Sequence, residues 1–241
     1  MEPYLFVLLV GLAAGAVSGV VGTGSSIMLL PVLVLTFGPK QAVPIMAVAA
    51  LMANLARVLA WWRDLDWRAF AAYSVPGVPA AALGARTLLE LPSIWLEAGL
   101  GLFFLMMIPV RHILAAKQIL IRWWQLSLAG AGIGFLTGLV LSTGPLSVPA
   151  FASYGLVKGA FLATEAASSL ALYASKVATF QELGALPAEL LMHGLIVGAS
   201  LTLGTFAAKA LVRRMKAVTF QYVLDVLLLA SGLSLLWAAL R

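Results

Sequence analysis

Residues 15–34 read GAVSGVVGTGSSIMLLPVLV, and residues 134–151 read GFLTGLVLSTGPLSVPAF. In both stretches a glycine-bearing apolar run ends in small polar residues, and a short apolar run containing a proline follows. Five pairs of positions, three of them within these stretches, are related by a shift of 118 or 119 residues: Gly11/Gly130, Gly15/Gly134, Gly19/Gly138, Pro31/Pro149 and Arg57/Lys176. The chain is therefore predicted to contain two copies of one structural unit.

The composition identifies lipid as the solvent for most of the chain. Of the 241 residues, 63% are hydrophobic and 10% are charged, whereas a soluble domain carries about 25% charged residues. The N-terminal segment lacks a basic region and contains Glu2, so we expect a first membrane helix there rather than a signal peptide. The apolar runs span 4–22, 24–37, 41–62, 69–88, 92–110, 124–141, 146–156, 159–180, 187–208 and 217–240.

Runs 24–37 and 146–156 are too short to cross a bilayer, which takes about 20 residues. Each half thus has the order long, short, long, long, long. If each long and short pair enters and returns to one side, ten basic residues share the cytoplasmic side, as the positive-inside rule requires: Arg63, Arg68, Arg111, Lys117, Arg122, Lys158, Lys209, Arg213, Arg214 and Lys216. Three basic residues fall on the other side: Lys40, Arg86 and Arg241.

This topology predicts an all-α polytopic membrane protein made of two inverted repeats. Each repeat has a broken or re-entrant helix pair followed by three transmembrane helices. Repeat 1 covers residues 1–114, a cytoplasmic linker covers 115–123, and repeat 2 covers 124–241. Both termini are expected outside the cytoplasm. Inverted repeats with paired broken helices are typical of secondary transporters.

The two breaks are the predicted binding site. A helix that begins inside the membrane presents unsatisfied N–H groups and the positive end of its dipole, which suit an anion. The candidate binding residues at the breaks are Gly22, Thr23, Gly24, Ser25, Ser26, Ser142, Thr143, Gly144 and Ser147. Small residues also allow close helix packing, and we favour that interpretation for the two glycine series but not for the breaks.

Ionisable residues inside the apolar runs are the next candidates, because such residues are costly in lipid and usually functional. Arg57 and Lys176 either reach out to the interface or attract an anion from opposite sides of the midplane. Glu165 and Asp225 have no acidic counterparts in the other repeat. One of them either pairs with Arg57 or carries a coupling proton. Asn54 is a candidate for the polar lining of the site.

Other function classes are excluded or disfavoured. The chain has no cysteine and two distant histidines, so we expect no metal and no cofactor. It contains none of the common catalytic motifs, so we expect no enzyme. The net charge of +6 is carried in short loops where it orients the helices, and we expect no nucleic-acid partner. The partners are then a small anion and the bilayer, with a homodimer left open.

Two further stretches complete a family resemblance: WWRDLDWRAF at 61–70 and PGVPAAALGA at 76–85. Together with the paired motifs quoted first, they resemble the TauE/SafE family of sulfite and organosulfonate exporters. The resemblance implies export of sulfite or a short sulfonate such as sulfoacetate through the cell inner membrane. The residues themselves predict only an anion-suited pocket. Uptake, a passive channel, or a non-transporting subunit of a membrane complex remain as alternatives.

Overall fold

The computed structural model describes residues 2–21, 25–116, 120–140, 144–156 and 158–207, and five positions nearer the C-terminus. The described residues form helices joined by short connections and include no strand. In chain order the elements are α1 (Glu2–Val21), α2 (Ser25–Phe37), α3 (Pro39–Trp61), the 3-10 turn η1 (Trp62–Asp64), α4 (Trp67–Glu90), α5 (Ser93–Ala116), α6 (Trp123–Leu139), α7 (Gly144–Ser153), α8 (Lys158–Glu182) and α9 (Ala188–Ala207).

Local sequence explains where several helices begin. Pro39 occupies the first turn of α3, where its missing N–H leaves no intrahelical bond unmade. The Asp66 carboxylate caps α4 by accepting a hydrogen bond from the Ala69 N–H at 2.9 Å. At α6 the Gln125 side chain accepts from the backbone N–H of Arg122 at 2.8 Å. Helices α4 and α6 therefore start at residues where a side chain accepts a hydrogen bond from an otherwise unpaired backbone N–H.

The glycines of α6 bring its backbone against α4. Gly134 lies so close to Gly77 that an added Cβ would stand 2.8 Å from the Gly77 Cα. Gly130 and Gly138 are held as tightly against neighbouring turns of α4. These contacts confirm that the second glycine series packs helices, as small residues do between membrane helices.

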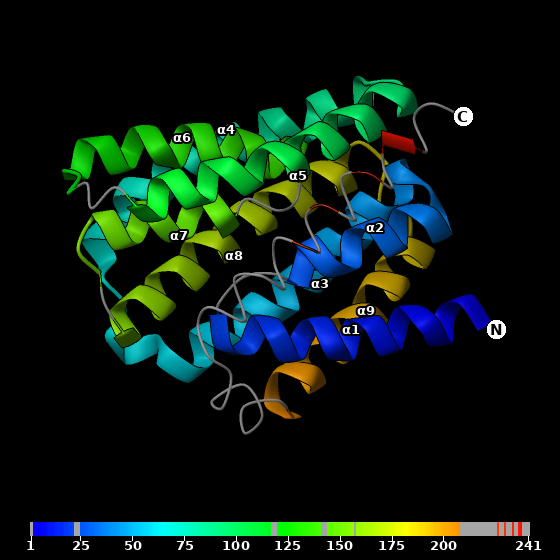
Figure 1. Ribbon diagram of the computed structural model, residues 1–241, viewed down its shortest axis with the longest axis horizontal. Coiled ribbons are helices and arrows are strands. Elements are labelled where there is room, and N and C mark those ends of the chain that lie inside the picture. Colours follow the sequence, from blue (N-terminus) through cyan, green and yellow to red (C-terminus); the bar gives the residue numbers. More distant parts are fainter. Residues whose placement is uncertain are drawn as a thin grey trace.

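The α1 and α9 helices form the other glycine-mediated pair. Gly15 of α1 faces the backbone of Leu201, and Gly204 of α9 faces the backbone of Leu12. Gly11 meets the side chain of Ser200. Figure 1 shows the α4–α6 pair and the α1–α9 pair at opposite edges of the molecule.

Helices α3 and α8 form the centre of the bundle, between these two pairs. They contact each other, and α9 packs on α3 while α4 packs on α8. The short helix α2 lies against α1 and α3, and the short helix α7 contacts α5, α6 and α8. The two short helices therefore start next to the central helices.

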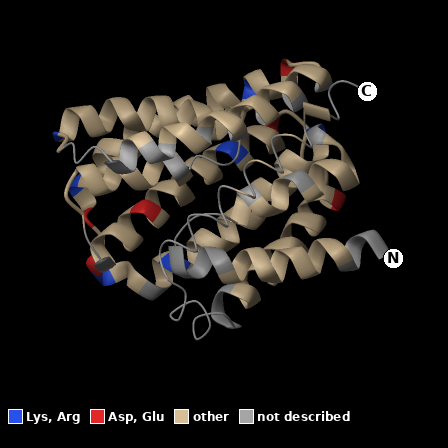
Figure 2. Cartoon of the chain, in the orientation of Figure 1, with Lys and Arg blue, Asp and Glu red and all other residues tan. Residues whose placement is uncertain are grey.

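Helix lengths and surface composition fit a bilayer. Helices α1, α3, α4, α5, α8 and α9 have 20 to 25 residues, and about 20 residues span the hydrocarbon layer at a rise of about 1.5 Å each. Within the described part, Lys40–Leu59 of α3 has a mean hydropathy of 1.9 and could cross a membrane by length and composition. Figure 2 shows charged residues to be few and gathered mostly toward the two ends of the bundle.

Two helices differ in extent from the apolar runs that predicted them. Helix α5 continues beyond the run at 92–110, as far as Ala116. Arg111 therefore lies on a helix, followed by the helix-forming, mostly apolar residues Ile113–Ala116. The second short helix was expected at 146–156, but α7 occupies Gly144–Ser153. Its start at Gly144 is consistent with Pro145 in the first helical turn.

Candidate functional site

A buried carboxylate, Glu165 of α8, organises the polar centre of the bundle. Its Oε2 lies 2.9 Å from Nη1 of Arg57 on α3, and only 3% of the Glu165 side chain is exposed. Its Oε1 accepts hydrogen bonds from the hydroxyls of Ser147 on α7, at 3.1 Å, and Ser169 on α8, at 2.9 Å. One carboxylate thus joins α3, α7 and α8.

Arg57 is positioned by its own helix as well as by Glu165. Its Nη2 donates to Oδ1 of Asn54, one turn earlier on α3. Asn54 is fixed in turn because its Nδ2 donates to the carbonyl oxygen of Ala50 at 2.8 Å. The Arg57 side chain is 13% exposed. We refer to Asn54, Arg57, Ser147, Glu165 and Ser169 as the central polar cluster.

The central polar cluster lies at the beginning of the short helix α7. Ser147 belongs to the first turn of α7, which begins at Gly144. A helix N-terminus carries a partial positive charge and attracts anions. The cluster therefore combines a guanidinium, two hydroxyl donors and a helix start around one negatively charged group. These are the features that a binding site for a small oxyanion requires.

The first short helix reaches the same region. Ser26, near the start of α2, lies within hydrogen-bonding reach of the Tyr173 side chain on α8. Tyr173 in turn lies within electrostatic reach of both Glu165 and Arg57. Ser25 is buried beside Ser26. Residues from the starts of α2 and α7 therefore approach one central region, from sequence positions about half a chain apart.

Lys176 is not part of the central polar cluster. It lies 11 residues beyond Glu165 on α8, which is about 16 Å along the helix axis. Its side chain is 0% exposed, so it does not reach out to an interface. Its Nζ donates to the carbonyl oxygen of Thr137 at 2.8 Å and lies 5.4 Å from the ring centroid of Phe180. Among the described residues no carboxylate forms an ion pair with it.

We predict that Lys176→Met leaves the folded state at least as stable as the wild type. The methionine side chain fills nearly the same volume as the lysine side chain. The variant loses one hydrogen bond, but it also avoids the free-energy cost of burying an ammonium group. Thermal unfolding in detergent, followed by tryptophan fluorescence, measures this. Lys40→Met, at an exposed position near the start of α3, is the control. If Lys176→Met lowers the free energy of unfolding by more than about 2 kcal/mol and Lys40→Met does not, Lys176 stabilises the folded state and the prediction is wrong.

Several predicted site residues lie outside the described residues. They are Gly22, Thr23 and Gly24 at the first break, Ser142 and Thr143 at the second, and Asp225 near the C-terminus. The helices on either side of each break end and begin beside them, at Val21 and Ser25 and at Leu139 and Gly144. These residues keep the status of predictions.

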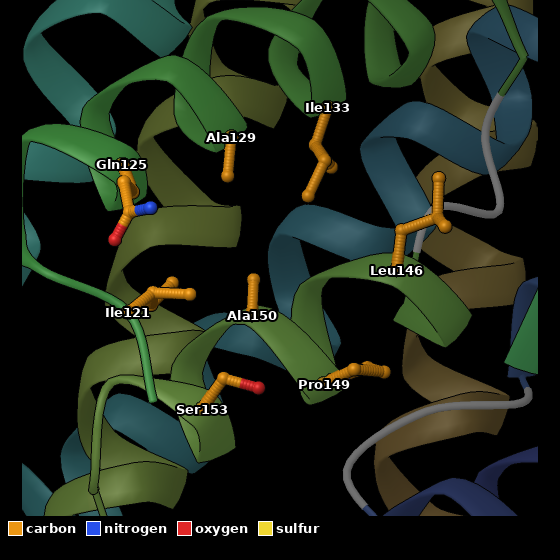
Figure 3. A pocket seen from close by; sticks show the side chains of 8 residues that line it. All are labelled: Ile121, Gln125, Ala129, Ile133, Leu146, Pro149, Ala150 and Ser153. Atoms are coloured by element: carbon orange, nitrogen blue, oxygen red, sulfur yellow. The ribbon is translucent and has the colours of Figure 1, made fainter. Parts of the chain in front are cut away.

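A cavity of about 250 Å³ opens between α6 and α7 (Figure 3). Its walls are mainly the apolar side chains of Ile121, Ala129, Ile133, Leu146 and Ala150. None of the described residues that line it is cationic. An anion transferred there would lose its hydration without gaining a charged partner, so we assign the anion site to the central polar cluster instead.

Sequence reasoning missed Ser169 and Tyr173. Both were detectable, because Glu165, Ser169 and Tyr173 follow at spacings of four residues and so share one face of α8. A buried acid next to hydroxyl-bearing residues on one helix face indicates a polar site rather than a single ion pair.

Comparison with known proteins adds the family. A family model described as sulfite exporter TauE/SafE matches residues 7–235, which is nearly the whole chain. The chain belongs to the TauE/SafE family. No curated protein matches it.

Membership of the TauE/SafE family confirms three expectations. The protein is a multi-pass membrane protein, it serves transmembrane transport, and it is not an enzyme. The all-helical fold expected from the composition agrees with the helices described above. A TauE/SafE protein with a buried arginine and hydroxyl donors at its centre thus has chemistry suited to an anionic substrate.

Proposed function

We propose that this protein is a secondary transporter that exports sulfite or a short organosulfonate such as sulfoacetate. The central polar cluster is the observation that carries the proposal. A sulfite or sulfonate group presents several oxygens around one atom, and the guanidinium of Arg57 with the hydroxyls of Ser147 and Ser169 can donate to such a group. The substrate would bind near the midplane, between the N-termini of the half-helices α2 and α7.

The proposed binding mode rests on two inverted repeats. In the alignment of the halves, α1 corresponds to α6, α4 to α9 and α3 to α8. The α1–α9 pair then corresponds to the α6–α4 pair, and the contact of α3 with α9 corresponds to that of α8 with α4. Such an exchange of partners is expected for two halves related by a pseudo-two-fold axis. It supports two repeats at 1–114 and 124–241, and the distribution of basic residues favours their inverted arrangement.

The direction of transport follows from physical and family arguments. The proposed topology has both termini outside the cytoplasm and the basic loops inside. A negative potential inside the cell drives an anion outward, at about 2.3 kcal/mol per charge and 100 mV. Export of a sulfur-containing anion agrees with the family description. Uptake and passive channel activity are the alternatives for the same site.

Transport by the purified protein is the test. Proteoliposomes are loaded with labelled sulfite or sulfoacetate, and efflux is followed over a range of internal concentrations. We predict saturable efflux and accelerated exchange when unlabelled substrate is present outside. Flux that rises linearly without exchange would favour a channel. A protein that moves neither anion in either direction would instead fit a subunit of a larger complex.

The hydroxyls of the two breaks provide the matching variants. We predict that replacing Thr23 and Thr143 by valine lowers efflux about tenfold or more, because each change removes a donor that a charged ligand would use. Thr202→Val is the control, because the Thr202 hydroxyl bonds the carbonyl of Gly198 within α9 at 2.8 Å. Unchanged efflux in the Thr23/Thr143 variant would remove the breaks from the site.

A further inference from the structure

We propose that Glu165 is an internal anion that occupies the hydrogen-bond donors of the proposed substrate site. One proton must therefore bind Glu165 whenever a substrate anion takes its place at Arg57. The inference rests on the proposed function and adds its coupling mechanism. It makes the protein a proton–anion cotransporter rather than a simple anion carrier. A doubly charged anion such as sulfoacetate that leaves with one proton still carries one net negative charge, so the membrane potential continues to favour its export.

The contacts of Glu165 are those that a bound oxyanion would make. Both carboxylate oxygens are engaged, Oε2 by Arg57 and Oε1 by the hydroxyls of Ser147 and Ser169. An ionised carboxylate can only accept hydrogen bonds, so the serines are its donors. Nη1 of Arg57 and the hydroxyls of Ser147 and Ser169 are therefore already used by the protein itself.

Charge balance makes the proton necessary. If an anion bound Arg57 while Glu165 stayed ionised, one guanidinium would face at least two negative charges in a buried space. Like charges in a low-dielectric site disfavour each other's ionised form. When Glu165 takes up a proton, the carboxylic acid gives up Arg57 and itself becomes a donor. The substrate anion then restores one negative partner for the guanidinium.

No other described charge near Glu165 can replace the proton. The helices α6 and α7, which also pack on α8, carry no titratable side chain. On the remaining neighbours, Arg57 of α3 pairs with Glu165, Tyr73 of α4 and Tyr173 of α8 lie within its electrostatic reach, and Asp64 and Asp66 lie at the turn before α4. The other charged residues of these elements form no ion pair with Glu165 within the part of the chain that the structure describes: Lys40, Arg63, Arg68, Arg86, Glu90, Lys158, Lys176 and Glu182. Arginine and tyrosine keep their protonation states through the neutral range. Both aspartates are acids and add no positive charge.

The direct measurement is proton uptake by the wild-type protein in detergent or nanodiscs. Sulfoacetate is titrated calorimetrically at several pH values in two buffers of different ionisation enthalpy, because a proton taken up on binding comes from the buffer and changes the measured heat. We expect uptake of close to one proton per bound anion at pH values where Glu165 is ionised. We also expect affinity to fall about tenfold per unit of rising pH in that range.

The variant Glu165→Gln supplies the second measurement. Glutamine keeps the shape and the neutral charge of the protonated acid, so we expect sulfoacetate affinity to become independent of pH and proton uptake to disappear. In proteoliposomes, a pH gradient should no longer alter efflux. Glu182→Gln is the matched control, because Glu182 forms an exposed ion pair with Arg86 at 3.8 Å. It should retain the wild-type proton uptake.

The outcomes separate this inference from the proposed function. Sulfoacetate binding with no proton uptake, or with proton release, overturns the coupling and leaves a sulfonate transporter in place. A pH response that survives Glu165→Gln has the same consequence and directs attention to Asp225. Absence of binding and transport for both sulfite and sulfoacetate overturns the proposed function, and the coupling with it. The wild-type measurement stands even if the variant does not fold.

Discussion

Replacing Arg57 by methionine is expected to reduce saturable efflux about a hundredfold or more. Arg57 holds the guanidinium that Glu165 contacts at 2.9 Å, and in our account the same group binds the substrate anion. Removing one partner of a buried, hydrogen-bonded charge pair typically costs about 2 to 5 kcal/mol, and about 1.4 kcal/mol corresponds to a factor of ten in rate. Initial rates from proteoliposomes at equal protein content measure the effect.

The Arg57 experiment needs controls for folding and for charge. Arg86→Met removes an exposed arginine whose ion pair with Glu182 spans 3.8 Å, and such a pair contributes little, so efflux should not change. Because Arg57→Met leaves Glu165 without its guanidinium, the double variant with Glu165→Gln is made as well. We expect it to fold and still not transport. A folded Arg57→Met protein with wild-type efflux would contradict the assignment.

The second large effect is expected on folding, from Gly138→Val. A Cβ at Gly138 would clash with the carbonyl oxygen of Ala81 and stand 2.7 Å from the backbone nitrogen of Ala85. Backbone atoms of α4 cannot move aside as a flexible side chain can, so α4 and α6 must separate. We expect a destabilisation of about 3 kcal/mol or more, at or above the upper end for overpacked cores.

The same helix supplies the control for Gly138→Val. Gly132 lies on the other face of α6, where an added Cβ would meet nothing within 4 Å. Gly132→Val should therefore behave like the wild type in detergent size-exclusion chromatography and thermal unfolding. Equal stability of the two variants would show that α4 and α6 do not pack through their backbones as described.

Much of the fold was predictable because it depends on local patterns. The apolar runs predicted the ends of the described helices to within a few residues. The short runs after the polar breaks predicted α2 and α7. The small residues of α6 predicted a close helix contact, which Gly134 and Gly77 make. The partner helix could not be predicted, since spacing within one helix carries no information about its neighbour.

The site was predictable in part for the same reason. Asn54, Arg57, Ser147 and Glu165 were each singled out by polarity inside an apolar run, and the structure brings all four together. The sequence could not decide which acid pairs with Arg57, because Glu165 and Asp225 both occur inside apolar runs. It also could not decide whether Lys176 is exposed, because depth along a helix does not give the direction of the side chain.

The most direct test of the central claim is the position of a bound substrate analogue. Selenite has the shape and charge of sulfite and scatters anomalously, and a chain without cysteine offers it no thiol to react with. Crystals of protein with ordinary methionine are soaked in selenite, and the anomalous difference map is calculated. Our account predicts a peak beside the guanidinium of Arg57, at the start of α7. A peak elsewhere, with none at Arg57, would contradict it.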